Sequence, residues 1–348
     1  MSIINGVSRR YLLKSGAVMG GALAMPYAFS RSAAAQSGTQ TVNFQTSWLI
    51  GGNQLGEIVA KHLGYFEEEK LDLVITPGGP NIDGVAMVAS GQAVVGQTSS
   101  SPSIMLARSQ NIPISCFAVC GQKHPYSYFS LPSNPVRTPA DMVGKRIGIQ
   151  IAGGQVLLNS ILRANGIPED DIEVVPIGFD FVPLISGQVD AISGWATSIR
   201  SLKALGPDYI TMGLWDNGVR LYALPYYATT ETLETKDETL AAFLKAAARG
   251  WGYAYENPEK SVEIMIAQYP DMGFDLANEI ETAKVQLSYV FNERTKELGW
   301  GTMDPAIWQE QIKQQADLKQ FTGAAPTVEM ISTDAILKAT EAVRPKLG

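Results

Sequence analysis

The sequence predicts an α/β protein with two lobes, each a mostly parallel sheet flanked by helices. The chain of 348 residues is 45% hydrophobic and 18% charged, which is a globular composition long enough for about two domains. From Thr41 onward, short apolar segments typical of strands alternate with segments whose apolar residues recur at helical spacing. This alternation restarts after Pro139, and alternating strands and helices favour parallel sheets covered on both faces.

Two successive series of elements account for this prediction. In the first we expect strands at 41–45, 71–76, 93–97 and 112–119, with helices at 55–63, 83–90 and 102–109. In the second we expect strands at 146–151, 172–177, 191–194 and 209–214, with helices at 156–164, 181–187 and 198–205. The remaining third is helical, because apolar residues keep helical register from Leu240 to Trp251 and again from Val262 to Tyr269.

Two extended, aromatic segments connect the series and suggest how the lobes are joined. Residues 126–131 lead from the first series into the second, and residues 220–228 lead out of it. Two such crossings would form a double hinge around a cleft. We therefore expect residues 36–125 plus 229–348 to form lobe 1, and residues 126–228 to form the hinge strands and lobe 2.

Residues 1–35 have the features of an export signal rather than of a folded domain. Arg9 and Arg10 are followed by Leu-Leu-Lys, a weakly hydrophobic run and Ala33-Ala34-Ala35, a small-residue cleavage site. The paired arginines are typical of a twin-arginine signal, with an ordinary secretory signal as the alternative. No cysteine for lipid attachment lies near this cleavage site, so we expect a soluble periplasmic protein without a lipid anchor.

Several function classes are disfavoured by what the sequence lacks. The net charge is −7, and no cluster of Lys and Arg lies in the body of the chain, which disfavours a nucleic-acid partner. No phosphate-binding loop and no nucleophile elbow is present. His62 and His124 have no metal-ligand spacing, and Cys116 and Cys120 lie on one predicted strand, too far apart for a disulfide. We expect no metal, no cofactor, no membrane insertion and no catalytic residue.

Polar and aromatic residues instead follow strand after strand. Ligands of open α/β sheets bind outside the carboxyl ends of the strands, where glycines admit a ligand close to the backbone and flat aromatic rings can enclose a flat one. The predicted ligand-binding residues are Trp48, Asn53, Gln54, Gly78, Thr98, Ser99, Ser100, Tyr126, Gly153, Gly154, Gln155, Asp180, Trp195, Thr197 and Tyr222.

Two sets of motifs resemble a known group of proteins. The first is Gly64-Tyr65-Phe66, Leu71-Asp72-Leu73 and Pro77-Gly78-Gly79, followed by Ser90-Gly91-Gln92; the second is Gly178-Phe179-Asp180 with 187–191, Gly-Gln-Val-Asp-Ala. These are similar to motifs of the periplasmic binding proteins of ABC importers, in the superfamily that takes nitrate, sulfonates, taurine, thiamine pyrimidines and riboflavin. The resemblance covers nearly all of the chain after the signal. It implies the type II two-lobe fold with a double-strand hinge.

The resemblance also implies a function, which is passive capture of a small molecule and its delivery to ABC permease subunits by a monomeric binding protein. Trp48, Trp195 and the tyrosines favour a flat nitrogen heterocycle, such as a pyrimidine thiamine precursor or a flavin. An alkylsulfonate, taurine or nitrate-type anion is the alternative ligand. A pyrimidine-synthase-like enzyme on the same fold, with Asp180 as its acidic group, and a sensor that docks on a receptor kinase are the alternative functions.

Overall fold

The computed structural model describes residues 38–150 and 153–348, and the predicted export signal at 1–35 lies outside them. The described chain contains two five-stranded sheets. The first has the order β2-β1-β3-β10-β4, with the strands β1 (Gln40–Gln45), β2 (Leu71–Thr76), β3 (Val95–Gln97), β4 (Ile114–Gly121) and β10 (Ala223–Thr229). The second has the order β7-β6-β8-β5-β9, with the strands β5 (Tyr126–Ser130), β6 (Arg146–Gln150), β7 (Glu173–Ile177), β8 (Ala191–Trp195) and β9 (Ile210–Gly213).

Both sheets are mixed and follow the same plan. In the first sheet β1 pairs in parallel with β2 and β3, whereas β10 is antiparallel to β3 and β4. In the second sheet β6 pairs in parallel with β7 and β8, whereas β5 is antiparallel to β8 and β9. The predicted α/β class with two sheets is confirmed, and each sheet contains one strand that runs against its neighbours.

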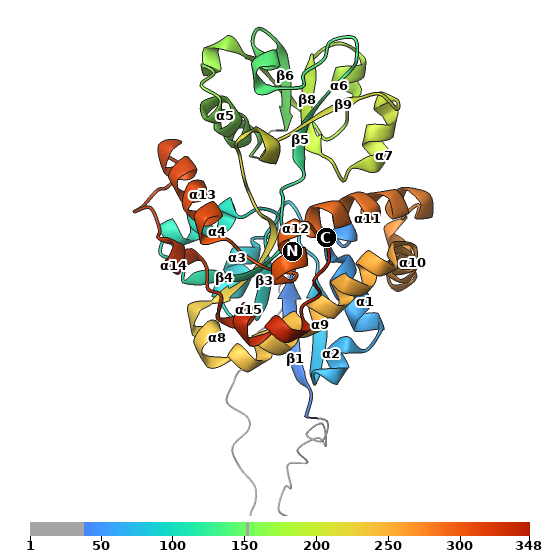
Figure 1. Ribbon diagram of the computed structural model, residues 1–348, viewed down its shortest axis with the longest axis vertical. Coiled ribbons are helices and arrows are strands. Elements are labelled where there is room, and N and C mark those ends of the chain that lie inside the picture. The colour runs from blue at the N-terminus through green and yellow to red at the C-terminus, as the bar shows by residue number, and fades with distance from the viewer. Residues whose placement is uncertain (1–37, 151–152) are drawn as a thin grey trace, which may run out of the picture. The chain divides into compact units, whose positions relative to one another are not determined.

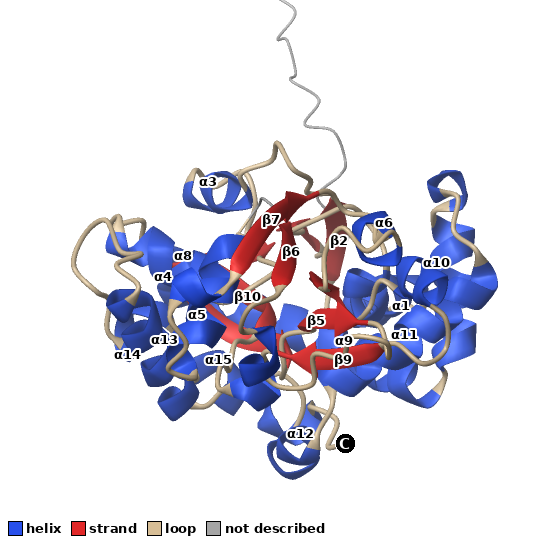
Figure 2. Cartoon of the chain, turned by 90° about the horizontal axis from the view of Figure 1, so that it is seen from above, coloured by secondary structure: helices blue, strands red, loops and turns tan. Residues whose placement is uncertain are grey.

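Helices pack on both faces of the strands (Figures 1 and 2). Those of the sequence up to residue 202 are α1 (Leu55–His62), α2 (Tyr65–Glu68), α3 (Gly84–Ala89), α4 (Pro102–Ser109), α5 (Gly154–Ala164), α6 (Val182–Ile185) and α7 (Ile199–Leu202). Those that follow are α8 (Thr230–Thr235), α9 (Asp237–Glu256), α10 (Pro258–Gln268), α11 (Leu276–Val290), α12 (Glu293–Leu298), α13 (Pro305–Asp317), α14 (Val328–Ile331) and α15 (Ala335–Ala339).

The two segments expected to cross between the lobes are strands of the sheets themselves. Residues 126–130 form β5 at the inner part of the second sheet, and residues 223–229 form β10 between β3 and β4 of the first. The sheets are joined instead by residues 122–125 and 214–222. An extended aromatic segment is equally suited to a strand and to a linker, so its sequence does not indicate which sheet it joins.

The largest hydrophobic core lies between the first sheet and helices α1 and α9. Its centre holds Phe44, Phe243 and Trp251, each with no exposed surface. In Figure 1, α1 and α2 in blue lie beside α9 and α10 in orange, so elements from the two ends of the sequence build one core. The expected C-terminal helices therefore cover the first sheet, as amphipathic helices commonly do.

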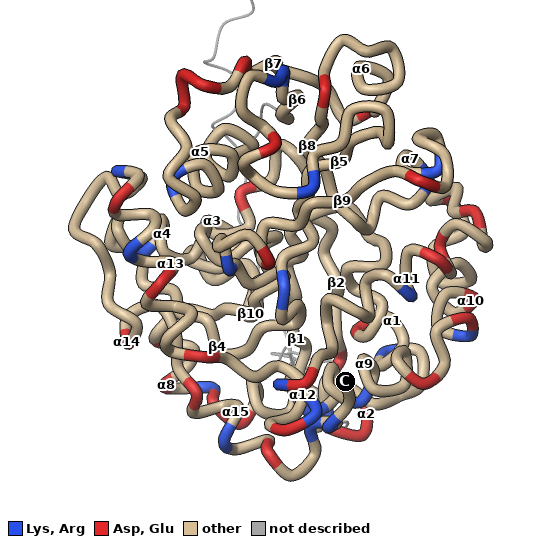
Figure 3. Tube along the Cα trace, turned by 45° about the horizontal axis from the view of Figure 1, so that its top comes forward, with Lys and Arg blue, Asp and Glu red and all other residues tan. Residues whose placement is uncertain are grey.

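Four further findings concern the charged residues, the cysteines, membrane-spanning helices and metal-ligating side chains. Figure 3 shows Lys and Arg interspersed with Asp and Glu along the described chain. Cys116 and Cys120 are both buried and free, as expected. Among the described residues, no helix is both long and apolar enough to cross a bilayer. No group of three or more metal-ligating side chains lies together in this part of the chain.

Candidate functional site

A cavity of about 570 Å³ opens at the carboxyl ends of three strands in the first sheet. Its walls come from the loops that follow β1, β2 and β3, from the first turn of α3 and from the ring of Tyr227 on β10. The lining residues are Thr46, Ser47, Pro80, Asn81, Ile82, Asp83, Gly84, Val85, Gln97, Thr98, Ser99, Ser100, Ser103 and Tyr227. Parallel strands place these loops at one edge of the sheet, which is where α/β proteins bind ligands.

Four polar atoms of the lining are buried without a hydrogen-bond partner among the described residues. They are the hydroxyl oxygens of Ser47, Ser100 and Tyr227, and the amide nitrogen Nε2 of Gln97. A buried polar group without a partner costs about 1–3 kcal/mol, so proteins rarely retain one without a use for it. Four residues of one cavity lining thus carry neutral polar groups whose hydrogen bonds are unmade in the described structure.

Tyr227 reaches the cavity because two glycines leave room for its side chain. A Cβ atom at Gly96, its neighbour across the β3–β10 pair, would lie 2.3 Å from the ring carbon that carries the hydroxyl. A Cβ atom at Gly84 would lie 3.5 Å from the hydroxyl oxygen itself. The ring therefore crosses over β3 and places its hydroxyl beside the first residue of α3. Burial raises the pKa of Tyr227 above its ordinary value, and the negative charge of Asp83 raises it as well.

Among the residues that line this cavity, Asp83 alone carries a formal charge. Its Oδ1 accepts a hydrogen bond of 3.0 Å from the backbone N–H of Ala86, which caps the N-terminus of α3. An anion in the cavity would meet this carboxylate and no lysine or arginine side chain of the lining.

The loop after β1 presents Trp48 at the surface, where the residue is 40% exposed. The backbone carbonyl of Trp48 accepts hydrogen bonds from the Thr46 hydroxyl at 2.7 Å and from the Gly78 N–H at 3.0 Å. Gly78 also donates to the Thr46 hydroxyl at 3.0 Å, and a Cβ at position 78 would lie 2.4 Å from the Thr46 carbonyl oxygen. Gly78 thus ties two loops together through the backbone and leaves the indole of Trp48 free.

Gln54 does not line the cavity but contacts Gln97, which does. It lies fully buried at the end of the short 3-10 turn Gly52–Gln54, and its Nε2 donates to Oε1 of Gln97 at 3.0 Å. Asn53, in the same turn, is half-buried. The Gln54 contact fixes the Gln97 amide so that its own Nε2 stays unpaired.

A second group of predicted residues gathers in the second sheet. Tyr126 and Trp195 face each other on paired strands, with ring centroids 6.0 Å apart, and the buried His124 ring lies 5.0 Å from Trp195. The Tyr126 hydroxyl lies 3.1 Å from the position of a Cβ on Gly154, and burial raises its pKa to about 12. Burial also lowers the pKa of His124 to about 4, so this imidazole is neutral.

The other predicted residues occupy varied surroundings. Thr98 and Ser99 line the cavity, and Thr98 also donates to the Ser100 carbonyl at 3.0 Å. Asp180 is exposed, and its Oδ1 accepts from the Val182 N–H at 3.0 Å at the start of α6. The exposed Gly153 and Gln155 flank the start of α5, and Thr197 follows β8, half-buried.

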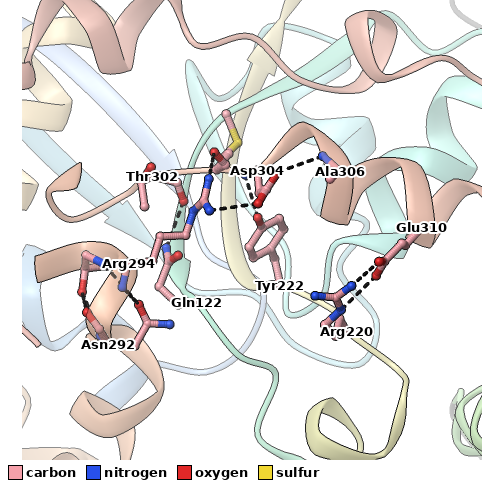
Figure 4. A network of polar contacts seen from close by, with 11 residues as sticks. Gln122, Arg220, Tyr222, Asn292, Arg294, Thr302, Asp304, Ala306 and Glu310 are labelled. Carbon is pink, nitrogen blue, oxygen red and sulfur yellow. Dashed lines mark hydrogen bonds and ion pairs between the residues drawn. The ribbon is translucent and has the colours of Figure 1, made fainter. Parts of the chain in front are cut away.

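The structure does not bring Tyr222 to the cavity. This side chain has no exposed surface, packs on Trp308 at a centroid distance of 5.3 Å and accepts a hydrogen bond of 2.8 Å from the Asp304 N–H. Figure 4 shows the hydroxyl directed toward Asp304, which is paired with Arg294 at 2.9 Å. Tyr222 therefore secures the second connection between the sheets against α13.

Of the residues that line the cavity, the sequence predicted Thr98, Ser99 and Ser100 and missed the others. Among those missed are Ser47, Asp83, Gln97 and Tyr227. Gln97 directly precedes the predicted Thr98, and Asp83 follows Gly78 in the same loop. Extending each predicted loop by a few residues would have included Ser47, Asp83 and Gln97. Tyr227 carries no such signal, because its position depends on the pairing of β10 with β3, in which Tyr227 lies opposite the distant Gly96.

A family model described as NMT1/THI5 like matches residues 52–261, more than half of the chain. The chain belongs to the NMT1/THI5-like family. Its fold is that of periplasmic binding proteins. The periplasmic aliphatic sulphonate binding protein SsuA of Escherichia coli superposes with a TM-score of 0.64 over 84% of this chain and 91% of that one, at 15% identity.

Two relatives align with most of this NMT1/THI5-like chain. The formylaminopyrimidine-binding protein of Halalkalibacterium halodurans is 28% identical over 280 residues, which cover 78% of this chain and 84% of the relative. The riboflavin-binding protein RibY of Chloroflexus aurantiacus is 25% identical over 281 residues, 79% of this chain and 80% of the relative. The resemblance read from the Gly-Tyr-Phe and Gly-Gln-Val-Asp-Ala motifs is thus confirmed at the level of family and fold.

Proposed function

We propose that this protein is the substrate-binding component of an ABC importer and that it captures a flat nitrogen heterocycle. The observation that carries the proposal is the cavity of the first sheet, whose lining includes the unpartnered polar side chains of Ser47, Gln97, Ser100 and Tyr227. The loop that contributes Ser47 also carries the exposed Trp48. Heterocycles of this kind combine ring atoms and exocyclic groups that hydrogen-bond in one plane with faces that stack on aromatic side chains.

The relatives support this proposal. The names of two of them state binding of a formylaminopyrimidine and of riboflavin, both of which contain flat nitrogen rings. We propose further that the protein is exported by the signal at residues 1–35, acts in the periplasm and delivers its ligand to permease subunits after the two sheets close around it. Trp195, half-buried beside His124 and Tyr126, is the aromatic surface that the second sheet contributes.

The charge of the cavity favours a neutral or cationic ligand over a sulfonate. Sites for anions commonly provide arginine, lysine or a set of backbone N–H groups. The lining contains no Lys or Arg, and its one charged residue, Asp83, would repel an anion.

A binding role is also favoured over catalysis. The acidic residue considered for an enzyme, Asp180, is exposed and serves the N-terminus of α6, where its carboxylate accepts a hydrogen bond from Val182. Turnover of a bound heterocycle by the purified protein would contradict this part of the proposal.

A thermal-shift panel tests the proposed ligand class, using substituted pyrimidines, riboflavin, taurine and alkylsulfonates at equal concentrations. A ligand present at 100 times its Kd stabilises the native state by about 2.7 kcal/mol. We expect at least one heterocycle to raise the melting temperature and the sulfonates to leave it unchanged. A shift with sulfonates alone would overturn the heterocycle assignment. Native mass spectrometry of gently purified protein provides an independent check through any co-purified small molecule.

A further inference from the structure

We propose that α11 is a clasp between the two halves of the protein, and that its contact with the 3-10 turn Lys203–Leu205 must break before the halves can separate. The second half consists of the described residues of 126–213, which contain β5 to β9. The first half consists of the other described residues, without the connections at 122–125 and 214–222. The inference goes beyond the proposed function, because it concerns the free protein and involves no ligand.

Helix α11 serves both halves with opposite faces. Residues three or four positions apart share one face of a helix. The face that packs into the core of the first sheet contains Ala283, Leu287 and Val290. The face that reaches the second half and the first connection contains Asn278, Glu281, Val285 and Tyr289. One helix therefore belongs to the core of one half and contacts the other.

Lys203 makes the polar part of this contact. Its Nζ donates hydrogen bonds to Oδ1 of Asn278 and to Oε1 of Glu281, both at 2.8 Å. These two acceptors lie about one turn apart, so one ammonium group bridges successive turns of α11. Val285, on the next turn, packs on a hydrophobic cluster of the second half that includes Phe181. An exposed ion pair alone contributes little, but this one is combined with a second hydrogen bond and an apolar contact.

The distance of this contact from the connection makes it sensitive to opening. The C-terminal end of α11 is fixed where the Tyr289 carbonyl accepts the N–H groups of Gln122 and Lys123, at 2.8 and 3.3 Å. Glu281 precedes Tyr289 by eight residues of the helix. At a rise of about 1.5 Å per residue, this places it about 12 Å from the connection. Rotation of the second half by about 20° about that point would lengthen the Lys203 hydrogen bonds by about 4 Å and break them.

Helices α5 and α13, which also belong to different halves, make no comparable contact. Residues of both line a cavity of about 470 Å³, among them Arg163 of α5. Within the described residues, no hydrogen bond or ion pair joins these two helices. The acids of α13 pair elsewhere, Glu310 with Arg220 and Asp317 with Lys313. Of these two places, α11 alone joins the halves through its side chains.

Double electron–electron resonance between two spin labels tests the inference on the ligand-free protein. Asp170→Cys in the second half and Glu238→Cys in the first place the labels at exposed positions outside the contact. Cys116 and Cys120 are buried, so the labels attach to the introduced cysteines. Separation of the halves appears as a second population in the distribution of distances between the labels.

Lys203→Met removes both hydrogen bonds and keeps most of the apolar stem. The ratio of the second population to the first should therefore rise by about two- to fivefold. Lys284→Met is the matched control, because Lys284 lies on the same helix but pairs at 3.0 Å with Glu259, within the first half. It should leave the distances unchanged. Both lysines are exposed, so both variants should keep the wild-type melting temperature within a few degrees.

Salt provides an independent readout. Raising NaCl from about 0.05 M to about 1 M screens exposed ion pairs, so the second population should grow in the protein with Lys203 and stay constant in Lys203→Met. The inference is wrong if Lys203→Met leaves the distances unchanged, if Lys284→Met alters them equally, or if salt acts equally on both proteins. None of these results bears on the proposed function, and a failed ligand panel would leave the clasp unaffected.

Discussion

The Cβ atom that any other residue would carry at position 250 would lie 2.0 Å from the carbonyl oxygen of Gly56. Helices α1 and α9 therefore cross in direct backbone contact, and the reciprocal Cβ at position 56 would lie 2.3 Å from the Trp251 ring. This contact holds α1 against the core of the first sheet, and α1 directly follows the turn that contains Gln54.

Gly250→Ala tests this contact. Alanine normally stabilises a helix interior relative to glycine by about 1 kcal/mol. Here we expect the opposite sign, a loss of about 3 kcal/mol in the free energy of unfolding, because the added methyl group meets backbone that cannot move aside. Urea denaturation measures the change. Gly252→Ala, in the same helix, would meet only the Pro345 side chain at 3.2 Å and should change stability far less. Equal effects of the two variants would show that helix propensity, and not the contact between α1 and α9, determines the change in the free energy of unfolding.

The pH dependence of stability should reveal the buried carboxyl of Glu57. Burial raises the pKa of Glu57 from 4.5 to about 7, although Tyr226 and Trp251 donate hydrogen bonds to its Oε1. Between pH 4.5 and 7 the native state keeps this proton and the unfolded state loses it, so stability falls as pH rises through this range. The shift corresponds to about 3 kcal/mol. Glu57→Gln should therefore stabilise the protein at pH 8, whereas Glu259→Gln, at an exposed position, should not.

His124 should produce the opposite slope. Burial lowers the pKa of His124 from 6.5 to about 4, so its contribution to stability is complete above pH 6.5 and is lost as the pH falls toward 4. Between about pH 4.5 and 6.5 the two groups nearly cancel. Removing Glu57 should unmask a stability that rises with pH in this range, and His124→Gln should unmask one that falls. Parallel curves for wild type and both variants would contradict the two assignments together.

Trp48→Ala should weaken binding of a flat ligand and leave the fold intact. The position of the loop depends on the Trp48 carbonyl, which Thr46 and Gly78 hold, and not on the indole. We expect a loss of affinity of at least tenfold, since stacking on an aromatic ring contributes about 1–3 kcal/mol in comparable base-binding sites. Calorimetric titration with the heterocycle found in the panel measures it. An unchanged Kd would remove Trp48 from the site.

Ser100→Ala should separate stability from function. The Ser100 hydroxyl is buried without a partner in the described structure, so its removal should stabilise the free protein by about 1 kcal/mol. The same change should weaken ligand binding, because the hydroxyl is proposed to contact the ligand. A control is Ser90→Ala, whose exposed hydroxyl donates to the Met87 carbonyl outside the cavity. A destabilised Ser100→Ala protein with normal affinity would show that the hydroxyl serves the fold.

Local periodicity was sufficient for the class of fold and for most elements. The apolar residues from Leu55 to His62 predicted α1 almost to the residue. His62, the last residue of this helix, lies exposed and contacts Gln268.

The cavity was only partly predictable, because part of its lining depends on strand pairing between distant segments. Thr98, Ser99 and Ser100 follow a strand and were found by that rule, which depends on local sequence. Tyr222 and Tyr227 lie in one aromatic segment, yet one packs on Trp308 and the other reaches the cavity. Their different roles arise from the pairing of β10 with β3 and β4, which no local pattern encodes.

The position of β10 also has a consequence for the order of folding. All strands of the second sheet lie between Tyr126 and Gly213, so this sheet can form from one continuous stretch of chain. The first sheet is complete only when β10 inserts between β3 and β4. This insertion pairs Ala228 with Ser115, and the sequence between these two residues contains all strands of the second sheet. Contacts of such sequence separation form slowly, because the intervening loop must be closed first. We therefore expect the second sheet to become protected from hydrogen exchange before the first sheet, which holds the cavity. The capacity to bind ligand should then be the last property that the refolding chain acquires.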